Sequence, residues 1–456
     1  MSNRFFGIFW HLPLVLLGVG ELFIVVISLG LAARVYGTVV DPYFLALLVA
    51  SGLIALGAFG LYSRRLRART SGTAIRILGG LVLGSALSAA AALILRMEPP
   101  PLRVFAVMSV IALAIMTALR YWVSHSKDSA IFRRKVLVFG AGVRAQSLTE
   151  LRRRSDMRGY QLDGFVSAEG ESPTVPKHLL LSIERGLRNA CEERGIDEIV
   201  VAMDDRRRNF PVAELLECRL AGIEVIELVS FLERETGKVR LDMLHPSWLI
   251  FASGFRQDAW REGTRRLFDI IASLLLILIS WPLMLLTALA IKLEDGWRAP
   301  VFYRQTRVGF MGCPFQIFKF RSMGTDAESD GKARWATQND NRATRVGRFI
   351  RMVRIDELPQ IFNVFVGDMS IVGPRPERPE FVSQLSERIP YFRERHYVRP
   401  GITGWAQLCY AYGASEQDAV EKLQFDLYYV KNHGLMFDLM ILLQTLEVIV
   451  FGKGAR

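Results

Sequence analysis

The stretch "LFDIIASLLLILISWPLMLLTALAIKLEDG", Leu267–Gly296, decides the fold of this 456-residue chain. Its apolar part is long enough to cross the hydrocarbon core of a bilayer, which takes about 20 residues. The basic residues on its two flanks are Arg256, Arg261, Arg265, Arg266, Lys292, Arg298, Arg304 and Arg307. Because positive charge marks the cytoplasmic side of a membrane segment, both ends of the stretch are predicted to lie in the cytoplasm.

A proline interrupts this stretch near its middle, in the order Ser280-Trp281-Pro282. Proline removes a backbone hydrogen-bond donor and kinks or breaks a helix. We therefore predict a re-entrant helix at about 267–293 that dips into one leaflet, breaks near Pro282 and returns. The alternative is a kinked helix that spans the bilayer once.

Further apolar segments fill the first quarter of the chain, and each is long enough to span. These segments are Leu12–Ala33, Tyr43–Tyr62, Ile75–Leu95 and Leu102–Val123. Basic residues gather after the second and the fourth segment, at Arg64, Arg65, Arg67, Arg69, Lys127, Arg133, Arg134 and Lys135. This pattern predicts a four-helix transmembrane bundle, residues 1–130, with both of its ends in the cytoplasm.

Glu21 lies inside the first apolar segment. An ionisable residue within a membrane segment is a functional-site hypothesis. The alternative, which we favour, is a carboxylate that serves helix packing or lies near the membrane interface.

The overall composition limits the function classes. Hydrophobic residues make up 51% of the chain, and the formal net charge is +12. A basic balance suits anionic lipid headgroups, phosphates or nucleic acid, but no nucleic-acid motif accompanies it, so we expect no nucleic-acid partner. The four cysteines form no C-x-x-C pair and the six histidines are scattered, which argues against a disulfide framework and a zinc site.

Strand-like and helix-like runs alternate between residues 131 and 250, which predicts a Rossmann-like α/β domain with a small parallel sheet. The strand-like runs are "KVLVFGAG", "GYQLDGFV", "DEIVVAM" and "IEVIELV". After the first of them, Gly140 and Gly142 begin the G-x-G-x-x-A pattern "GAGVRA", a nucleotide-loop candidate. No clear acidic residue follows the second strand, so we favour a structural or regulatory domain.

A second decisive stretch, "RIDELPQIFNVFVGDMSIVGPRP", runs from Arg354 to Pro376. Pro359 suits the first turn of a helix, which would place Asp356 and Glu357 at the N-terminal edge of that helix. Its apolar face would carry Leu358, Ile361, Phe362 and Phe365. For an isolated acidic pair the ordinary interpretation is a helix cap.

Cationic residues around this pair favour a chemical role over a cap. They are Lys319, Arg321, Arg348, Arg351, Arg354 and Arg375, the last of which lies between two prolines. Guanidinium forks match phosphate oxygens, so the cluster suits a diphosphate. Carboxylates beside such a cluster can hold Mg²⁺, attack phosphorus, or do both.

The same region resembles the bacterial polyprenyl-phosphate sugar-1-phosphate transferases, the monotopic phosphoglycosyl transferases that start exopolysaccharide and O-antigen assembly. The resemblance covers about Arg261–Phe451 and rests on the blocks "VFYRQTRVG", "FQIFKFRSM", "IDELPQIFNVFVGDMSIVGPRP" and "RPGITGWAQ". The extension through "RPERPEFV" and "IPYFRERHYVRPGITGWAQ" is similar to an exopolysaccharide subgroup. The upstream apolar segments and α/β domain match the large form of the family.

What the resemblance implies is a reaction in two steps. Asp356 corresponds to the family's nucleophile, which attacks the sugar-bearing phosphate of a UDP-sugar, releases UMP and becomes an aspartyl phosphosugar. Glu357 completes the dyad and positions the metal or the acceptor phosphate. In the second step undecaprenyl phosphate takes the phosphosugar and becomes a lipid diphosphosugar. The family also implies Mg²⁺, with Asp356 as its ligand.

Other positions carry over individually. Arg375 corresponds to the phosphate-binding arginine, and Lys319, Arg321 and Arg351 align with further basic site positions. Ser280 and Pro282 fall where the family breaks its re-entrant helix, although Trp281 separates them here, which leaves the role of the serine open. The donor sugar is open as well, with glucose or galactose suggested by large-form members.

The resulting expectation is a multidomain protein of the bacterial inner membrane. Residues 251–456 would form a mostly helical catalytic domain with a re-entrant membrane helix, on the cytoplasmic face and in contact with inner-membrane lipids. A homodimer through the α/β domain is one arrangement left open.

Three rival functions remain to be compared with this one. A nucleotide-sugar dehydratase or epimerase would need a Tyr-x-x-x-Lys pair, and a metal-dependent glycosyltransferase would need Asp-x-Asp; the sequence contains neither. A membrane receptor whose α/β domain senses a ligand would release no UMP.

Overall fold

The computed structural model describes residues 3–5, 8–10, 12–59, 61, 70–125, 133–151, 159–183, 186–205, 210–244, 259–324, 342–410 and 415–451. The predicted loop residues Arg64, Arg65, Arg67, Arg69, Lys127 and Arg256 lie outside this range. The chain divides into two compact units, Met1–Gly237 and Lys238–Arg456.

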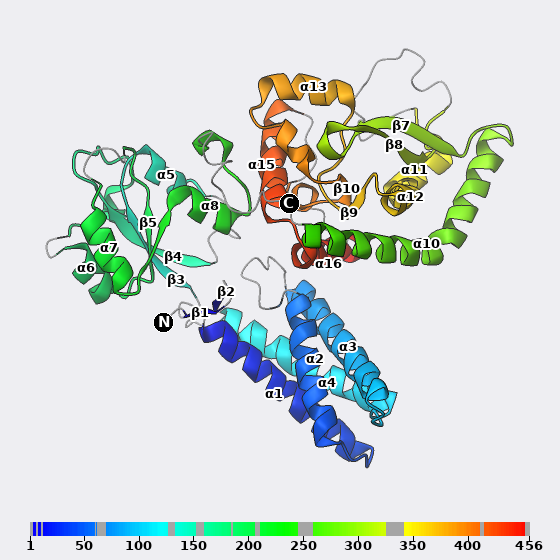
Figure 1. The fold of residues 1–456 in the computed structure, drawn as a ribbon, viewed down its shortest axis with the longest axis horizontal. Helices are drawn as coiled ribbons and strands as arrows, with labels where there is room; N and C mark the ends of the chain where they lie inside the picture. Colours follow the sequence, from blue (N-terminus) through cyan, green and yellow to red (C-terminus); the bar gives the residue numbers. More distant parts are fainter. Residues whose placement is uncertain are drawn as a thin grey trace. The chain divides into compact units, whose positions relative to one another are not determined.

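The first unit begins with apolar helices that pack as a bundle (Figure 1). They are α1 (Leu12–Val35), α2 (Pro42–Ala58), α3 (Thr70–Ile94) and α4 (Leu102–His125), after a short antiparallel pair of strands, β1 (Asn3–Phe5) and β2 (Ile8–Trp10). Three of the helices, α1, α3 and α4, are long and apolar enough to cross a membrane, while α2 has 17 residues. The predicted block of apolar helices is therefore present, although its second helix ends four residues before Tyr62.

Glycines allow α2 and α3 to approach each other closely. A Cβ atom at Gly84 of α3 would lie 3.1 Å from the Cα atom of Gly52 in α2. One helical turn earlier in α3, a Cβ at Gly80 would lie 2.6 Å from the Leu56 side chain. Small residues at such positions are how helices pack where lipid removes the hydrophobic driving force.

Glu21 is fully buried and pairs with an arginine of α4. Arg120 Nε lies 2.5 Å from Glu21 Oε1, and Arg120 Nη2 donates to Glu21 Oε2 at 2.9 Å. A third nitrogen of Arg120 donates to the carbonyl of Leu61 at 3.1 Å. These contacts support the helix-packing interpretation of Glu21.

We expect Glu21→Ala to destabilise the bundle, because it leaves the Arg120 guanidinium buried without its carboxylate. Breaking such a pair costs about 3–5 kcal/mol, whereas replacing both partners by apolar residues is often neutral. Thermal melting in detergent should show a lower melting temperature for Glu21→Ala, recovery in Glu21→Leu/Arg120→Leu, and no change for the exposed Glu98→Ala. Equal melting of Glu21→Ala and Glu98→Ala would contradict a packing role.

A four-stranded parallel sheet follows in the same unit, in the order β4-β3-β5-β6. Its strands are β3 (Arg134–Phe139), β4 (Tyr160–Val166), β5 (Glu198–Val201) and β6 (Glu224–Glu227), and its helices are α5 (Val143–Thr149), α6 (Leu187–Arg194), α7 (Val212–Leu220) and α8 (Leu228–Thr236), with a 3-10 turn at Lys177–Leu179. The predicted parallel α/β arrangement is present. In sequence order the sheet reads 2-1-3-4, the beginning of the flavodoxin-like order 2-1-3-4-5.

The second unit contains one very long helix, small strand pairs and several short helices. After a 3-10 turn at Leu241–Met243, its elements are α10 (Ala259–Asp295), β7 (Phe302–Val308), η4 (Phe310–Gly312), β8 (Pro314–Phe320), α11 (Arg345–Met352), η5 (Ile355–Glu357), α12 (Gln360–Val366), β9 (Ser370–Val372), α13 (Pro379–Arg388), η6 (Arg393–Tyr397), β10 (Gly401–Thr403), α14 (Trp405–Cys409), α15 (Glu416–Asn432) and α16 (Leu435–Phe451). Strands β7 and β8 form an antiparallel hairpin, and β9 pairs with β10 in parallel.

Helix α10 runs through Pro282 as one continuous helix of 37 residues. The break in the helix that the sequence predicted near Pro282 is therefore not observed. Figure 1 shows that the helix instead changes direction partway along its length. Proline is a usual cause of such a bend, and Pro282 is the proline inside this helix.

Large apolar side chains remain exposed on several helices of this unit. On α10 they include Leu274, Leu278, Trp281, Leu285 and Leu289, and on the short helices Phe349, Met352, Phe362, Phe365 and Val366. The predicted apolar face of α12 is therefore only partly buried: Ile361 is in the interior, whereas Phe362 and Phe365 are about two fifths exposed (39% and 41%). Exposed apolar surface of this extent marks an interaction with a membrane or a protein.

Candidate active site

The acidic pair lies in the 3-10 turn η5, between α11 and α12. Pro359 occupies the position just before α12, which begins at Gln360. The pair therefore lies just before the N-terminal end of the helix, in a 3-10 turn of its own, and Pro359 is the residue before the first turn and not part of it. Arg354, the residue before this turn, has a left-handed backbone with φ of 58°, which is uncommon for a residue with a side chain.

Glu357 joins cations from two distant parts of the chain. Its Oε1 atom accepts a hydrogen bond from Arg375 Nη2 at 2.7 Å and lies 3.4 Å from Lys319 Nζ. Burial raises the pKa of Glu357, but the charges of Arg375 and Lys319 outweigh it and hold the pKa well below its usual range. Glu357 is therefore an ionised anchor that holds these two cations together.

Asp356 has no hydrogen-bond or ion-pair partner among the residues that the structure describes. Burial and the neighbouring charge of Glu357 raise the pKa of Asp356, against the opposing charges of Lys319, Arg351 and Arg375. Two adjacent carboxylates thus have pKa values shifted in opposite directions, a pattern that separates chemical roles. Of the two carboxylates, Asp356 is the one that the described residues leave without a hydrogen-bond partner.

The cations of the site outnumber the carboxylates that face them. Burial lowers the pKa of Lys319, and the charges of Arg375 and Arg307 lower it further, against the opposing charge of Glu357. Burial also lowers the pKa of Arg307, and the charges of Arg375 and Arg378 add to this shift against the opposing charge of Glu377. A buried cluster in which cations repel one another is stabilised by a bound anion, and a diphosphate supplies the required charge.

The remaining predicted site residues lie at different positions. Arg351, on α11, acts on Asp356 through its charge. Arg321 follows β8, and its Nη1 atom is buried without a hydrogen-bond partner within the described part of the chain. Ser280 and Pro282 lie inside α10, where the Ser280 hydroxyl contacts Met284 Sδ at 3.5 Å. The structure thus brings together Glu357, Lys319 and Arg375, with Arg351 near Asp356.

Arg307 also acts on this site through its charge on Lys319, although the sequence did not predict it as a site residue. It belongs to β7, and its Nη1 atom donates to the carbonyl of Pro376 at 3.2 Å. Arg307 belongs to the block "VFYRQTRVG", on which the family resemblance rests. The block contains two arginines, and its sequence does not tell which of them faces the site.

Two of the sequence blocks meet because glycines permit it. A Cβ atom at Gly401 would lie 2.0 Å from the backbone nitrogen of Gly373, and a Cβ at Gly404 would lie 2.2 Å from the Gly373 carbonyl oxygen. These contacts join "GDMSIVGPRP" to "RPGITGWAQ" through β9 and β10. They fix the start of the segment that carries Arg375.

The nucleotide-loop candidate in the α/β domain is occupied by the chain's own carboxylates. Asp204 accepts hydrogen bonds from the backbone amides of Val143 and Arg144, at 2.8 Å each. Glu171 accepts from the amides of Ala141 at 2.8 Å and Asp204 at 3.0 Å. Since the amides that would bind a pyrophosphate already have partners, this geometry supports the structural interpretation of Gly140 and Gly142.

Comparison with known proteins places this site in a family. Residues 260–452 match the model of the bacterial sugar transferase domain. The chain is 44% identical over 242 residues to a UDP-N-acetylgalactosamine-undecaprenyl-phosphate N-acetylgalactosaminephosphotransferase of Aeromonas hydrophila, covering 53% of this chain and 56% of that protein. It is 34% identical to the undecaprenyl-phosphate glucose phosphotransferase of Komagataeibacter xylinus, and the match covers 71% of this chain and 60% of that protein. A UDP-glucose:undecaprenyl-phosphate glucose-1-phosphate transferase of Klebsiella pneumoniae is 33% identical, and the match covers 71% of this chain and 69% of that protein.

The chain belongs to the bacterial sugar transferase family. This result confirms the family resemblance predicted from the four sequence blocks. The matched part spans between half and two thirds of the length of the first two relatives.

Proposed function

We propose that this chain transfers a sugar 1-phosphate from a UDP-sugar to undecaprenyl phosphate and so makes the lipid diphosphosugar that initiates exopolysaccharide assembly. The observation that carries the proposal is the contrast within the acidic pair. Asp356 has no partner among the described residues, while Glu357 holds Arg375 and Lys319 beside it. A nucleophile therefore stands next to a cationic site of the charge that a diphosphate requires.

In the first step a carboxylate oxygen of Asp356 attacks the sugar-bearing phosphorus of the donor. The new oxygen–phosphorus bond forms as the bond to the bridging oxygen breaks, and UMP leaves with that oxygen and its electron pair. Arg375 and Lys319 neutralise the charge that develops on the phosphoryl oxygens. The product on the protein is an acyl phosphate that carries the sugar.

In the second step a phosphate oxygen of undecaprenyl phosphate attacks the same phosphorus and the carboxylate of Asp356 is released. Two successive displacements allow one site to serve a soluble donor and a membrane-bound acceptor in turn. Glu357 takes no part in bond making; it orients the two cations and, through its charge, raises the pKa of Asp356.

Mg²⁺ fits this site with few protein ligands. No group of three or more His, Cys, Asp or Glu side chains that could hold a metal occurs among the described residues, but Mg²⁺ is commonly held by one or two carboxylates together with substrate phosphates and water. Asp356 is the carboxylate with unused oxygens. When bound, the ion would supply additional neutralisation of the diphosphate charge.

The proposed location is the cytoplasmic face of the bacterial inner membrane. The apolar helices α1 to α4 would anchor the chain, and α10 would enter the cytoplasmic leaflet as a re-entrant helix that turns at Pro282. The exposed apolar residues of α10 and the bend in Figure 1 support this topology. A homodimer through the α/β domain remains part of the proposal.

The direct test of the activity uses the purified full-length protein with undecaprenyl phosphate, Mg²⁺ and a panel of UDP-sugars that includes UDP-glucose, UDP-galactose and UDP-N-acetylgalactosamine. We expect UMP release with at least one donor, together with a lipid diphosphosugar of that sugar. No UMP release with any donor would favour the receptor function instead.

A change in the pH dependence should follow from the charges around Asp356. The Lys319 ammonium lowers the pKa of Asp356, so Lys319→Met should raise that pKa and move the acid limb of the pH–activity profile upward by about one pH unit. Lys238→Met, which removes a lysine paired with Glu421 at 2.8 Å, should leave the limb in place. An unshifted limb in Lys319→Met would show that Asp356 does not control the acid side of the profile.

A further inference from the structure

Arg375 lies in a short segment, residues 372–377, which we call the arginine loop. The carbonyl oxygens of this loop accept hydrogen bonds as follows: Val372 from Arg265 and Tyr429, Pro374 from the Gly401 amide, Arg375 from Arg395, Pro376 from Arg307, and Glu377 from the Val308 amide. The guanidinium groups of Arg265, Arg307 and Arg395, which come from three different elements, thus hold the backbone of the loop. This loop carries the Arg375 guanidinium.

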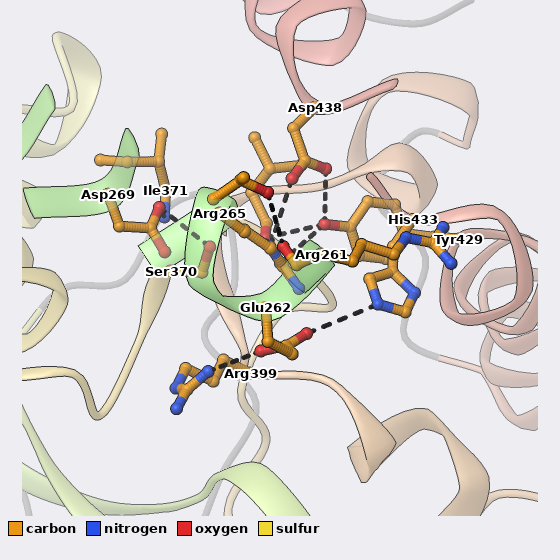
Figure 2. A network of polar contacts seen from close by, with 12 residues as sticks. Arg261, Glu262, Arg265, Asp269, Ser370, Ile371, Arg399, Tyr429, His433 and Asp438 are labelled. Carbon is orange, nitrogen blue, oxygen red and sulfur yellow. Dashed lines mark hydrogen bonds and ion pairs between the residues drawn. The ribbon is translucent and has the colours of Figure 1, made fainter. Parts of the chain in front are cut away.

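The first of these groups comes from the helix expected to enter the membrane. Arg265 Nη2 of α10 donates to the Val372 carbonyl at 2.5 Å and to the Tyr429 hydroxyl at 2.8 Å. The Tyr429 hydroxyl lies 2.7 Å from Asp438 Oδ1 and 3.0 Å from the same carbonyl. Figure 2 shows Arg265, Tyr429 and Asp438 pointing toward one another, with Asp269 of α10 joined to Ser370 and Ile371 of β9.

The second group holds Arg375 itself. Arg395 Nη2 of η6 donates to the Arg375 carbonyl at 3.1 Å and pairs with Asp426 Oδ2 of α15 at 2.7 Å. The side chains of Arg395 and Asp426 are 6% and 3% exposed. Burial raises the pKa of Asp426 to about 6, although the charge of Arg395 opposes the shift.

Fold stability alone does not account for these buried charges. Replacing a buried ion pair by apolar residues of similar volume is often neutral or stabilising, because removing two charges from water is costly. What the pairs provide is directional donors aimed at particular carbonyl oxygens. Transition-state stabilisation depends on such fixed geometry, since a misplacement of about 1 Å can cost on the order of 100-fold in rate.

We propose that the Arg265–Tyr429–Asp438 cluster and the Arg395–Asp426 pair are positioning groups, which set the Arg375 guanidinium against the donor diphosphate and tie that placement to α10. This inference rests on the proposed function. None of these groups touches the reacting atoms; each acts through the backbone of the arginine loop. Their removal should therefore matter only where the Arg375 side chain is present.

The test is a double-mutant cycle in the full-length protein, with UMP release divided by the amount of folded protein. Tyr429→Phe removes one hydroxyl and keeps the ring that packs near Phe437. Its matched control is Tyr428→Phe, in the neighbouring residue of α15, whose ring packs near Trp405 and Phe437. We expect Tyr429→Phe to lower kcat/KM about tenfold in the wild type and less than about twofold in Arg375→Ala, and Tyr428→Phe to change it less than about twofold in both.

The outcomes distinguish a failure of the positioning role from a failure of the proposed function. An equal loss from Tyr429→Phe with and without the Arg375 side chain would overturn the positioning role, because a merely structural effect is additive. Equal behaviour of Tyr429→Phe and Tyr428→Phe in an active wild type would also overturn it. A wild type that releases no UMP would overturn the proposed function itself. If Tyr429→Phe does not fold, Asp426→Asn enters the same cycle with the same expected pattern.

Discussion

Asp356→Asn should abolish UMP release from the UDP-sugar donor, with turnover falling on the order of 10⁴-fold or more, the scale seen when a covalent nucleophile is removed. The amide keeps the shape of the carboxylate but cannot form the acyl phosphate. Because Asp356 has no hydrogen-bond partner among the described residues, the substitution breaks no contact that holds the fold. Removing its charge also relieves the repulsion from Glu357, so the variant should melt no lower than the wild type.

Asp368→Asn is the matched control for this experiment. Asp368 belongs to the same block, is exposed, and has Asn363 Nδ2 at 3.4 Å from its carboxylate. We expect its UMP release to stay within about threefold of the wild type, as for a surface position away from the chemistry. A large loss in Asp368→Asn, or activity retained in Asp356→Asn, would move the nucleophile away from position 356.

Arg375→Ala should have the second-largest effect, a loss of about 10²–10³-fold in kcat/KM, comparable to the removal of one oxyanion-stabilising donor. Its guanidinium is the nearer of the two cations on Glu357, at 2.7 Å against 3.4 Å for Lys319. The substitution therefore removes the proposed phosphate ligand and also weakens the contact network around Glu357 that holds Lys319. Arg375→Lys should recover only part of the loss, since an ammonium cannot reproduce a bidentate fork.

Steady-state UMP release with the donor that the panel identifies measures both effects. The control is Arg393→Ala, because Arg393 is exposed and lies in the neighbouring turn η6. We expect the control to remain within about threefold of the wild type. Equal losses in Arg375→Ala and Arg393→Ala would mean that general positive charge, and not a positioned guanidinium, attracts the donor.

The main elements of the fold could be predicted from local sequence patterns. Apolar segment length predicted the helices of the N-terminal block, and strand-like apolar runs alternating with helix-like segments predicted the strands of the parallel sheet. The local pattern could not give the end of α2 at Ala58, because the following residues are also apolar. It also predicted a helix break at Pro282, whereas α10 continues through that residue as one bent helix.

For the site, the residue types could be predicted from the sequence, whereas their pairing is visible only in the structure. An acidic pair among arginines indicated phosphate chemistry, and spacing alone could not tell that Glu357, rather than Asp356, would face Arg375. The carboxylates that occupy the glycine loop are 30 or more residues away from it in the chain. The contact of Arg395 with the Arg375 carbonyl likewise spans 20 residues. Such contacts depend on the tertiary fold and leave no periodic signal.

The most direct measurement of the central claim is the mass of the intact protein after incubation with UDP-sugar and Mg²⁺ in the absence of acceptor. After an acid quench, the account predicts an added mass of one sugar phosphate, located by peptide mapping on Asp356 and lost when undecaprenyl phosphate is supplied. An unmodified protein that releases UMP only when the lipid acceptor is present would contradict it, because the transfer would then be a single direct displacement.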